Sequence, residues 1–477
     1  MTVTEEKPQI EPMLLEEGGA KLGVSKKAPQ LLVASIVCLC AVLAGTCIAW
    51  SSPVLSELEN ENSTLPITQS EGSWISSLLA IGAIVGAPLT GFLVEKFGRK
   101  MTNLMLGFPF LASWALIVFT NSVTWLYIAR ILGGIATGGA CVATPMYVSE
   151  ISEDSLRGTL GAFFQLFLTS GILGVFAISS VVTYKVMSTC CGLITVIFVL
   201  LFYFFCPETP TYLLKINKTS DAKNALFRLR GERCGAERVL KQIQEDIDKS
   251  SGGNVSIKDL FSNRVTFRGL VATLGLMVFQ QLSGINAVIF YSVSIFKLAG
   301  SDLDPAVSSI IIAAVQVVMS LAAIGLVEKF GRKTLLMISS TVMGICLAAL
   351  GYYFRVQTSG EDVTSLGWLP LSSLVLFIVA FCIAYGPIPW MVMGEIFSAD
   401  VKGAACSLTV IASWSLVFLV TKVFPSMRET LGGDVTFWIF TFMMIVATAF
   451  VFFLVPETKD KTLAEVQDEL RGHQSRI

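Results

Sequence analysis

The sequence predicts an all-α membrane protein whose twelve transmembrane helices form two similar halves. Hydrophobic residues make up 53% of the 477 residues and charged residues only 14%, a composition that a soluble domain of this length does not need. Apolar stretches of roughly 20 residues, the length that crosses a bilayer, recur along the chain. The octamer LVEKFGRK also occurs twice, at residues 93–100 and 326–333.

The twelve apolar stretches divide evenly between the two halves. The expected spans of the first half are 31–55, 74–94, 102–120, 124–148, 158–181 and 186–206, and those of the second half are 269–296, 306–327, 334–354, 370–394, 404–424 and 436–455. One such stretch could be a buried helix of a soluble protein, but twelve in one chain indicate a membrane protein.

A second repeated motif supports an internal duplication. Pro-Glu-Thr ends an apolar run at residues 207–209 and again at 456–458. The two octamers lie 233 residues apart and the two Pro-Glu-Thr motifs 249 residues apart. Two motifs in the same order and at nearly the same separation indicate that each half repeats one six-helix design.

The charges in the connections predict the orientation of the chain. Both octamers and the segment 207–268 carry many Lys and Arg residues, whereas the loops after the first and ninth spans are acidic. Because positive loops stay in the cytoplasm, we expect 1–30 to be a disordered cytoplasmic tail, 207–268 a cytoplasmic linker and 456–477 a second cytoplasmic tail. The two six-helix halves are then 31–206 and 269–455.

The linker has its own pattern. Apolar residues recur at helical spacing between charged ones across residues 220–250, which predicts short amphipathic helices lying under the membrane part. A domain that binds another protein is the alternative, and the sequence identifies no such partner.

Composition also excludes several classes of function. The single histidine, His473, lies in the polar C-terminal tail, so a histidine-based catalytic pair is not expected. No metal cluster, phosphate-binding glycine loop or cofactor motif stands out, the eleven cysteines lie mostly inside spans, and the net charge of −1 gives no reason to expect a nucleic-acid partner. Repeated helical halves without catalytic residues are typical of a carrier rather than an enzyme.

Several motifs together make the chain resemble the sugar porter family of the major facilitator superfamily, from about residue 31 to 462. They are the two octamers, Arg130 with Gly134, Glu150 followed by Arg157-Gly158, PETP at 207–210, QQLSGIN at 280–286, GPIPW at 386–390, Glu395, and PETK at 456–459. Among animal members, the chain is most similar to facilitated trehalose transporters and their hexose-carrying relatives.

The resemblance implies the major facilitator fold and a facilitative carrier of trehalose or a hexose that works by alternating access. Three alternatives share this fold: a proton-coupled sugar symporter, a carrier of another polyol or organic solute, and a sugar sensor that does not transport. The sequence does not choose among the sugars.

The QQLSGIN run supplies candidate sugar ligands. Sugar hydroxyls need paired donors and acceptors, and Gln280, Gln281 and Asn286 place neutral amides inside an apolar span, where an unpaired amide is costly. Hydrogen bonding between helices is the alternative role for these amides. The resemblance adds four residues to the candidate substrate site: Gln165, Gln316, Trp390 and Trp414. Ser413 and Phe290 stand where the family more often has asparagine and tyrosine, which leaves room for a different or larger sugar.

The octamers supply a candidate cytoplasmic gate. The resemblance places seven charged residues at the cytoplasmic helix ends: Glu95, Arg99, Glu150, Arg157, Glu328, Arg332 and Glu395. We expect opposite charges among them to form a reversible latch that holds the two halves together, because each exposed pair contributes only about 0–1 kcal/mol. Topology signals alone are the alternative. Lys402 stands where the family usually has arginine, which predicts a weaker latch in the second half.

Two features bear on coupling to ions. Arg130 lies well inside the fourth span, where a charge faces the bundle interior, and we expect it to make a structural contact near the external side. Residues 31–55 contain no Asp, Glu, His, Lys or Arg, although symporters of the family place an aspartate there. The sequence therefore favours transport uncoupled from protons.

The remaining expectations concern modification and location. Asn62-Ser63-Thr64 is a glycosylation acceptor in the first external loop. The plasma membrane is the expected location, with both termini cytoplasmic. The run Glu11-Pro12-Met13-Leu14-Leu15 resembles an acidic dileucine sorting signal, so an endosomal or lysosomal membrane is the alternative.

Overall fold

The computed structural model describes residues 26–471 except 61, 62, 64, 154, 233, 251–263, 301, 302, 398, 460 and 462. Within helices it leaves undescribed the side chains of residues 157, 158, 246, 249, 250, 324, 328, 399, 400, 402–404, 463 and 464. Several predictions fall on these positions. The glycosylation acceptor Asn62, the sorting signal at 11–15, and the side chains of Arg157, Glu328 and Lys402 lie outside the described residues.

The first half contains six membrane crossings. They are α1 (Lys27–Ala49) with its continuation α2 (Ser51–Leu58), α3 (Gln69–Phe97), α4 (Arg99–Phe119), α5 (Val123–Ile151), α6 (Arg157–Ser179) and α7 (Tyr184–Phe205). Helix α1 begins inside the predicted tail 1–30, because the buried Gln30 side chain accepts a hydrogen bond from the backbone N–H of Glu153 at 3.0 Å and ties this end to the bundle.

The second half repeats this plan with more interruptions. Its elements are α12 (Arg264–Leu282), α13 (Ile285–Ala299), α14 (Pro305–Phe330), α15 (Arg332–Thr358), a 3₁₀ turn (Thr364–Leu366), α16 (Leu369–Ala380), a π-helical turn (Phe381–Tyr385), α17 (Ile388–Ile396) and α18 (Ala399–Leu454). The predicted spans 269–296 and 370–394 are thus each built from two helices.

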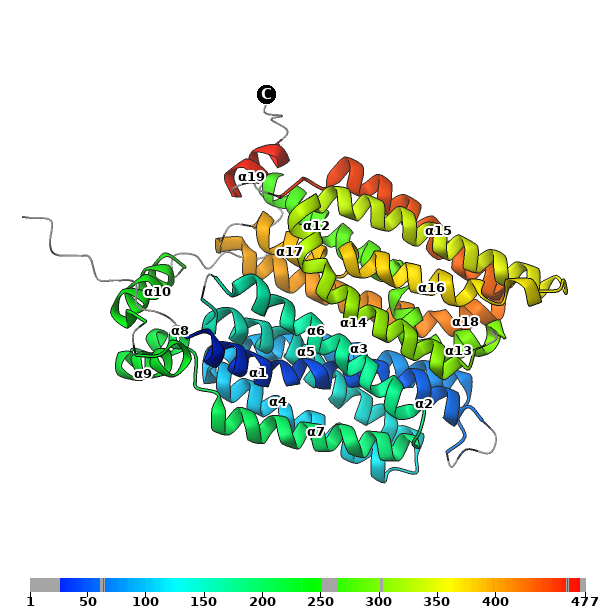
Figure 1. The fold of residues 1–477 in the computed structure, drawn as a ribbon, viewed down its shortest axis with the longest axis horizontal. Helices are drawn as coiled ribbons and strands as arrows, with labels where there is room; N and C mark the ends of the chain where they lie inside the picture. The colour runs from blue at the N-terminus through cyan, green and yellow to red at the C-terminus, as the bar shows by residue number, and fades with distance from the viewer. Residues whose placement is uncertain are drawn as a thin grey trace, which may run out of the picture.

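The described residues hold eleven helices long and apolar enough to cross a membrane. The last of them, Ala405–Leu454, is 50 residues long and contains two crossings. Gly432, with φ +87°, interrupts it, and Figure 1 shows the chain reversing there, from an orange arm to a red arm beside α15. Twelve crossings in two halves of six confirm the predicted fold class.

The linker forms three short helices that dock on the first half. These are α8 (Pro210–Lys215), α9 (Thr219–Arg230) and α10 (Ala236–Ser250). They share a small apolar core that includes Leu214, Leu226 and Leu240, and the backbone N–H of Lys26 donates to the carbonyl of Arg230 at 2.9 Å. The predicted amphipathic helices are therefore present. Figure 1 shows them at the same end of the bundle as α19 (Leu463–Arg471), which lies in the predicted tail 456–477.

The two halves make contact at the opposite end of the bundle, the predicted external end. The hydroxyl groups of Ser52 and Ser292 lie 3.0 Å apart. Lys422 on α18 donates to the Ser73 hydroxyl at 2.7 Å, and its ammonium group lies 4.0 Å from the centre of the Trp74 ring. These contacts join α2 and α3 of the first half to α13 and α18 of the second, so the external end is closed in this conformation.

Candidate functional site

The amides of the QQLSGIN run form one buried network. Gln280 Nε2 donates to the carbonyl of Tyr385 at 2.5 Å, and Gln281 Nε2 donates to Gln280 Oε1 at 3.2 Å and to Ser413 Oγ at 2.8 Å. Asn286 Nδ2 donates to Gln281 Oε1. The network therefore links α12, α13, the π-helical turn and α18.

Local backbone breaks explain why these groups can meet. Gly284 has φ +85°, a left-handed conformation that glycine adopts without strain, and it separates α12 from α13. Helix α17 begins with Pro389 near its start. Proline has no backbone N–H, so the Tyr385 carbonyl four residues earlier has no helical donor from Pro389 and accepts from Gln280 instead. Two discontinuous helices thus meet at one polar cluster, the arrangement that forms binding sites in many carriers.

The other four predicted substrate-site residues lie on helices α6, α14, α17 and α18 and are not hydrogen-bonded to this network in the described part of the chain. Gln165 is half-buried on α6, Gln316 is buried on α14, and α6 packs against α14 across the two halves. Trp414 follows Ser413 on α18 and is half-buried, whereas Trp390 on α17 is exposed. Between described residues, no hydrogen bond joins these four side chains to Gln280, Gln281 or Asn286.

The main-chain carbonyl of Tyr385 was not predicted as part of the site. A carbonyl carries no residue-type signal, but a proline four residues later is a usable one, because it removes that carbonyl's helical partner. Ser413 was predicted only as a departure from the family pattern, and in the structure its hydroxyl holds Gln281 in place.

Arg99 is the centre of the cytoplasmic charge cluster in the first half. Its guanidinium is almost fully buried and contacts Glu150 Oε1 at 2.8 Å and Glu95 Oε1 at 3.3 Å. Glu150 also accepts a 2.6 Å hydrogen bond from the Thr209 hydroxyl. The cluster therefore ties the ends of α3, α4 and α5 to the start of the linker.

The second half contains a sparser version of this cluster. Arg332 at the start of α15 contacts Glu395 Oε1 at the end of α17 at 3.1 Å, and both side chains are more exposed than Arg99. The weaker latch predicted for this half rested on Lys402, whose side chain lies outside the described residues, so it stays a prediction.

The described ion pairs of Arg99 and Arg332 differ from the predicted latch in one respect. They join helices of the same half, and not the two halves to each other. The physical reason is local: each arginine opens a helix directly after the preceding one ends, and the acidic partners Glu95, Glu150 and Glu395 end neighbouring helices of the same half. In this conformation the pairs therefore brace each half internally.

Each half also has a carboxylate cap beneath its octamer. Glu208 accepts from the backbone N–H groups of Arg99 and Lys100, at 3.0–3.1 Å, and Glu457 accepts from those of Arg332 and Lys333, both at 3.0 Å. A carboxylate at a helix N-terminus satisfies free N–H groups and favours the helix dipole. The repeated Pro-Glu-Thr motif thus caps the helix that the repeated octamer starts.

The two caps differ electrostatically. Burial raises the pKa of Glu208 above its usual value, although the N–H groups of Thr209, Lys100 and Arg99 favour the carboxylate. Burial also disfavours the charge on Glu457, but the backbone N–H groups around it outweigh burial, so its pKa lies below the usual value.

Arg130 makes the structural contact predicted for it. Its side chain is buried, Nε donates to the carbonyl of Ile75 at 2.9 Å, and Nη1 donates to the carbonyl of Cys47 at 2.7 Å. The guanidinium lies 5.2 Å from the Trp50 ring, at the break between α1 and α2. Arg130 therefore joins α1, α3 and α5 through main-chain carbonyls close to the closed external end.

Comparison with known proteins agrees with this architecture. The family model described as "Sugar (and other) transporter" matches residues 33–470. The chain is 36% identical to the facilitated trehalose transporter Tret1 of Anopheles gambiae, over 97% of this chain and 60% of the relative. It is 35% identical to Tret1 of Polypedilum vanderplanki, over 97% and 94%.

A solved structure with the same fold is the partially occluded, inward-open xylose transporter XylE from E. coli. It shares 25% identity with this chain, with a TM-score of 0.77 over 91% of this chain and 100% of XylE. The chain spans about 60% of the length of the mosquito relative. Since the family model covers nearly the whole sequence and the fold is that of a major facilitator, the chain belongs to the sugar transporter family.

Proposed function

We propose that the protein is a facilitative carrier that moves trehalose or a hexose across a membrane by alternating access. The buried network of Gln280, Gln281 and Asn286 carries the proposal. It places several amide groups at the junction of broken helices, where a sugar's hydroxyls can exchange hydrogen bonds with them. The names of the relatives, facilitated trehalose transporters, support the choice of substrate class.

The geometry supports a simple cycle. In the present conformation the contacts of Ser52 with Ser292 and of Lys422 with Ser73 hold the external end closed. Opening that end requires these few polar contacts to break, and the buried hydroxyls of Ser52, Ser292 and Ser73 must then bond to water or to other partners. A sugar bound at Gln165, Gln280, Gln281, Asn286 and neighbouring residues would then be accessible from the external side of the membrane. We infer that the cytoplasmic charges rearrange in that second state and join the two halves.

Counterflow in proteoliposomes is the experiment that tests the function. Vesicles preloaded with unlabelled trehalose or glucose should transiently accumulate the same labelled sugar if the protein is a carrier. A sugar sensor would bind the labelled sugar without any flux. Absence of counterflow for both sugars and for other polyols would reject the proposal.

Transport should be independent of a proton gradient. The buried cation Arg130 donates to two carbonyls. The acidic side chains of the described spans lie at helix ends, such as Glu57, Glu150 and Glu395, or beside the reversal at Gly432, where Asp434 is paired with Arg355. A symporter needs a titratable group that is reachable from the sugar cavity. Initial uptake should therefore be unchanged by an uncoupler, and sugar should equilibrate without accumulating. Accumulation in vesicles given only a proton gradient would favour the symporter.

Charge reversal at the octamers should change the rate of exchange. Arg99→Glu would bring a fourth carboxylate close to Glu95, Glu150 and Glu208, which now surround the arginine. Because the cytoplasmic gate could then no longer form, Arg99→Glu and Arg332→Glu should slow exchange while one-sided sugar binding persists. The larger loss is expected for Arg99, which is more buried and has more partners. Normal exchange in both variants would leave the octamers as topology signals only.

The proposed location is the plasma membrane, with both termini in the cytoplasm and an endosomal or lysosomal membrane as the alternative. The basic residues of the linker and octamers support this orientation. Glycosylation of Asn62 would place the first loop outside, which a shift in electrophoretic mobility after glycosidase treatment can test.

A further inference from the structure

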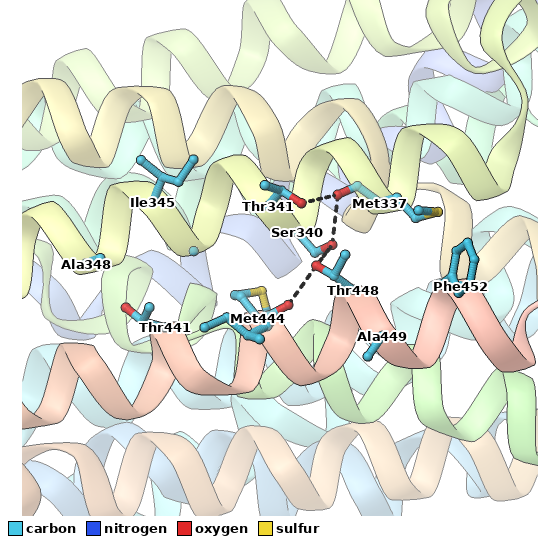
Figure 2. A pocket seen from close by; sticks show the side chains of 12 residues that line it. Met337, Ser340, Thr341, Ile345, Ala348, Thr441, Met444, Thr448, Ala449 and Phe452 are labelled. Atoms are coloured by element: carbon cyan, nitrogen blue, oxygen red, sulfur yellow. Dashed lines mark hydrogen bonds between the residues drawn. The ribbon is translucent and has the colours of Figure 1, made fainter.

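A crevice of about 640 Å³ lies between α15 and the second arm of α18, away from the candidate sugar site. Its lining runs from Met337 to Ala348 on α15 and from Thr441 to Phe452 on α18. Figure 2 shows the two helices side by side, with Ser340 and Thr448 pointing toward one another. The small residues Ala348 and Ala449 leave the space open, whereas Gly344 lies against Met444, whose Cβ would stand 3.3 Å from an added Cβ.

The crevice opens to the surface that faces the bilayer. Ile345 and Ile445 expose 64% and 62% of their side chains, and Phe452 exposes 54%. Exposed apolar side chains at mid-span positions of a membrane protein face hydrocarbon rather than water. The occupant of the crevice is therefore a molecule that is present in the membrane.

The polar groups of the crevice are already satisfied by the protein. Thr341 and Thr441 each donate to a carbonyl of their own helix. The hydroxyls of Ser340 and Thr448 lie 2.7 Å apart, so one of them donates to the other, which in turn donates to a carbonyl of its own helix. No hydroxyl group has to bond to an occupant. The interior of the crevice therefore suits a hydrocarbon chain and not a sugar or a polar headgroup.

The length of the crevice matches one leaflet. The lining residues lie within a stretch of twelve positions on each helix, 337–348 and 441–452, which is about 17 Å long at 1.5 Å per residue. A bilayer core is about 30 Å thick, so one leaflet spans about half of that. The lining begins only five residues after the start of α15 at Arg332, on the side of the linker helices. This places the crevice in the leaflet that the charge distribution predicts to be cytoplasmic.

Basic residues stand at the mouth of the crevice. The ammonium group of Lys333 lies 5.8 Å from the centre of the Phe452 ring, which lines the crevice. Lys459 donates to the carbonyl of Lys329 at 2.9 Å, so both of these lysines stand at the same helix ends. The nearby carboxylate of Glu457 is occupied by backbone N–H groups, and Arg332 is paired with Glu395.

We propose that this crevice binds an anionic phospholipid. One acyl chain lies between α15 and α18, and the phosphate headgroup contacts Lys333, with Lys329 and Lys459 adding positive charge. Basic pockets between transmembrane helices on the cytoplasmic side suit such headgroups, and that leaflet carries the anionic lipids. The site is separate from sugar transport, so it can be tested without any transport assay.

The internal duplication provides a matched control. Lys100 and Tyr203 are the counterparts of Lys333 and Phe452 in the first half, and the Lys100 ammonium lies 5.6 Å from the Tyr203 ring. There, however, Lys100 donates to the Tyr203 carbonyl at 3.0 Å. Gly107 is covered by Val199, whose Cγ2 lies so close that a Cβ on Gly107 would clash with it. The corresponding lysine is thus engaged by a protein carbonyl, and the two helices are in contact in both halves, since the Ser340 and Thr448 hydroxyls lie 2.7 Å apart.

The test is a competition between lipids on the purified full-length protein. Detergent-solubilised protein is equilibrated with equal amounts of phosphatidylserine and phosphatidylcholine, and bound lipid is counted by native mass spectrometry. The wild-type protein should retain phosphatidylserine preferentially. Lys333→Gln should lower that preference about fivefold, whereas Lys333→Arg and Lys100→Gln should preserve it. Ala449→Phe, which fills the crevice, should reduce retention of both lipids.

Several outcomes would overturn the proposal. Equal retention of the two lipids by the wild-type protein would contradict the proposed contact between Lys333 and an anionic headgroup. Equal losses for Lys333→Gln and Lys100→Gln would indicate a general surface attraction. A dimer in lipid-free detergent that is lost in Ala449→Phe would show that a second copy of the chain covers the crevice. Each variant should elute as a monodisperse peak, which separates these outcomes from misfolding.

Discussion

Replacing Gln281 by alanine is expected to lower saturable sugar uptake about tenfold or more without loss of protein from the membrane. The Gln281 amide bonds to Gln280, Ser413 and Asn286 at once. Its removal leaves these buried groups with unmatched donors or acceptors and also takes one donor and one acceptor from the proposed sugar site. Each unmatched buried group costs about 1–3 kcal/mol, and about 1.4 kcal/mol corresponds to a factor of ten.

The measurement is initial uptake of labelled trehalose and glucose in proteoliposomes, normalised to the amount of folded protein. Gln357→Ala is the matched control, because Gln357 lies near the end of α15, where its amide donates to the Leu298 carbonyl away from the network. Uptake by this control should equal that of the wild-type protein. Wild-type kinetics for Gln281→Ala would remove the residue from the sugar site and leave the network a purely structural role.

The sequence was sufficient for the architecture because hydrophobic length and internal repetition are signals spread over many residues. A span of about 20 apolar residues can be recognised even when its boundaries are placed several residues wrongly. The number of crossings, twelve, could therefore be predicted. The breaks inside three of the predicted spans were harder to place. Trp50, Gly284 and the π-helical turn at Phe381–Tyr385 interrupt segments whose hydrophobicity is continuous, and only local backbone chemistry at Gly284 and Pro389 indicates two of them.

The sequence predicted which residues lie at the site better than it predicted which groups they bond to. Gln280, Gln281 and Asn286 lie together as expected, because amides in hydrocarbon must be paired. Which groups pair with them could not be read from the sequence, since the Tyr385 carbonyl is available only through the break before α17. For the cytoplasmic charges the residue types suggested ion pairs, but a pattern of charges does not say whether Arg99 and Arg332 pair within a half or between halves.

A large loss of stability is also expected from replacing a glycine of the repeated octamer, in which Gly98 and Gly331 separate consecutive helices. Gly98 has φ +88° and ψ 171°, and Gly331 has φ +85° and ψ 157°, a region that only glycine adopts readily. A Cβ on Gly98 would stand 2.5 Å from Glu208 Oε2 and 2.6 Å from Tyr212 Cε1. The missing side chain therefore lets the Glu208 carboxylate reach the N-terminus of α4, which explains why the octamer and Pro-Glu-Thr are duplicated together.

Gly98→Ala should consequently destabilise the folded protein by about 2–4 kcal/mol, because backbone strain of about 1–3 kcal/mol adds to the displacement of a helix cap worth about 1 kcal/mol. Gly331→Ala should have a smaller effect, since the nearest atom, Glu457 Oε2, would lie 2.9 Å from its Cβ. Gly91→Ala is the control, because Gly91 lies inside α3 and no described atom beyond its own helix backbone would stand within 4 Å of the added methyl group. Thermal unfolding in detergent, followed by the loss of the monodisperse peak, measures all three. A melting temperature for Gly98→Ala equal to that of Gly91→Ala would contradict the role of the glycine, because the same added methyl group would then be tolerated beside a buried carboxylate as well as in open space.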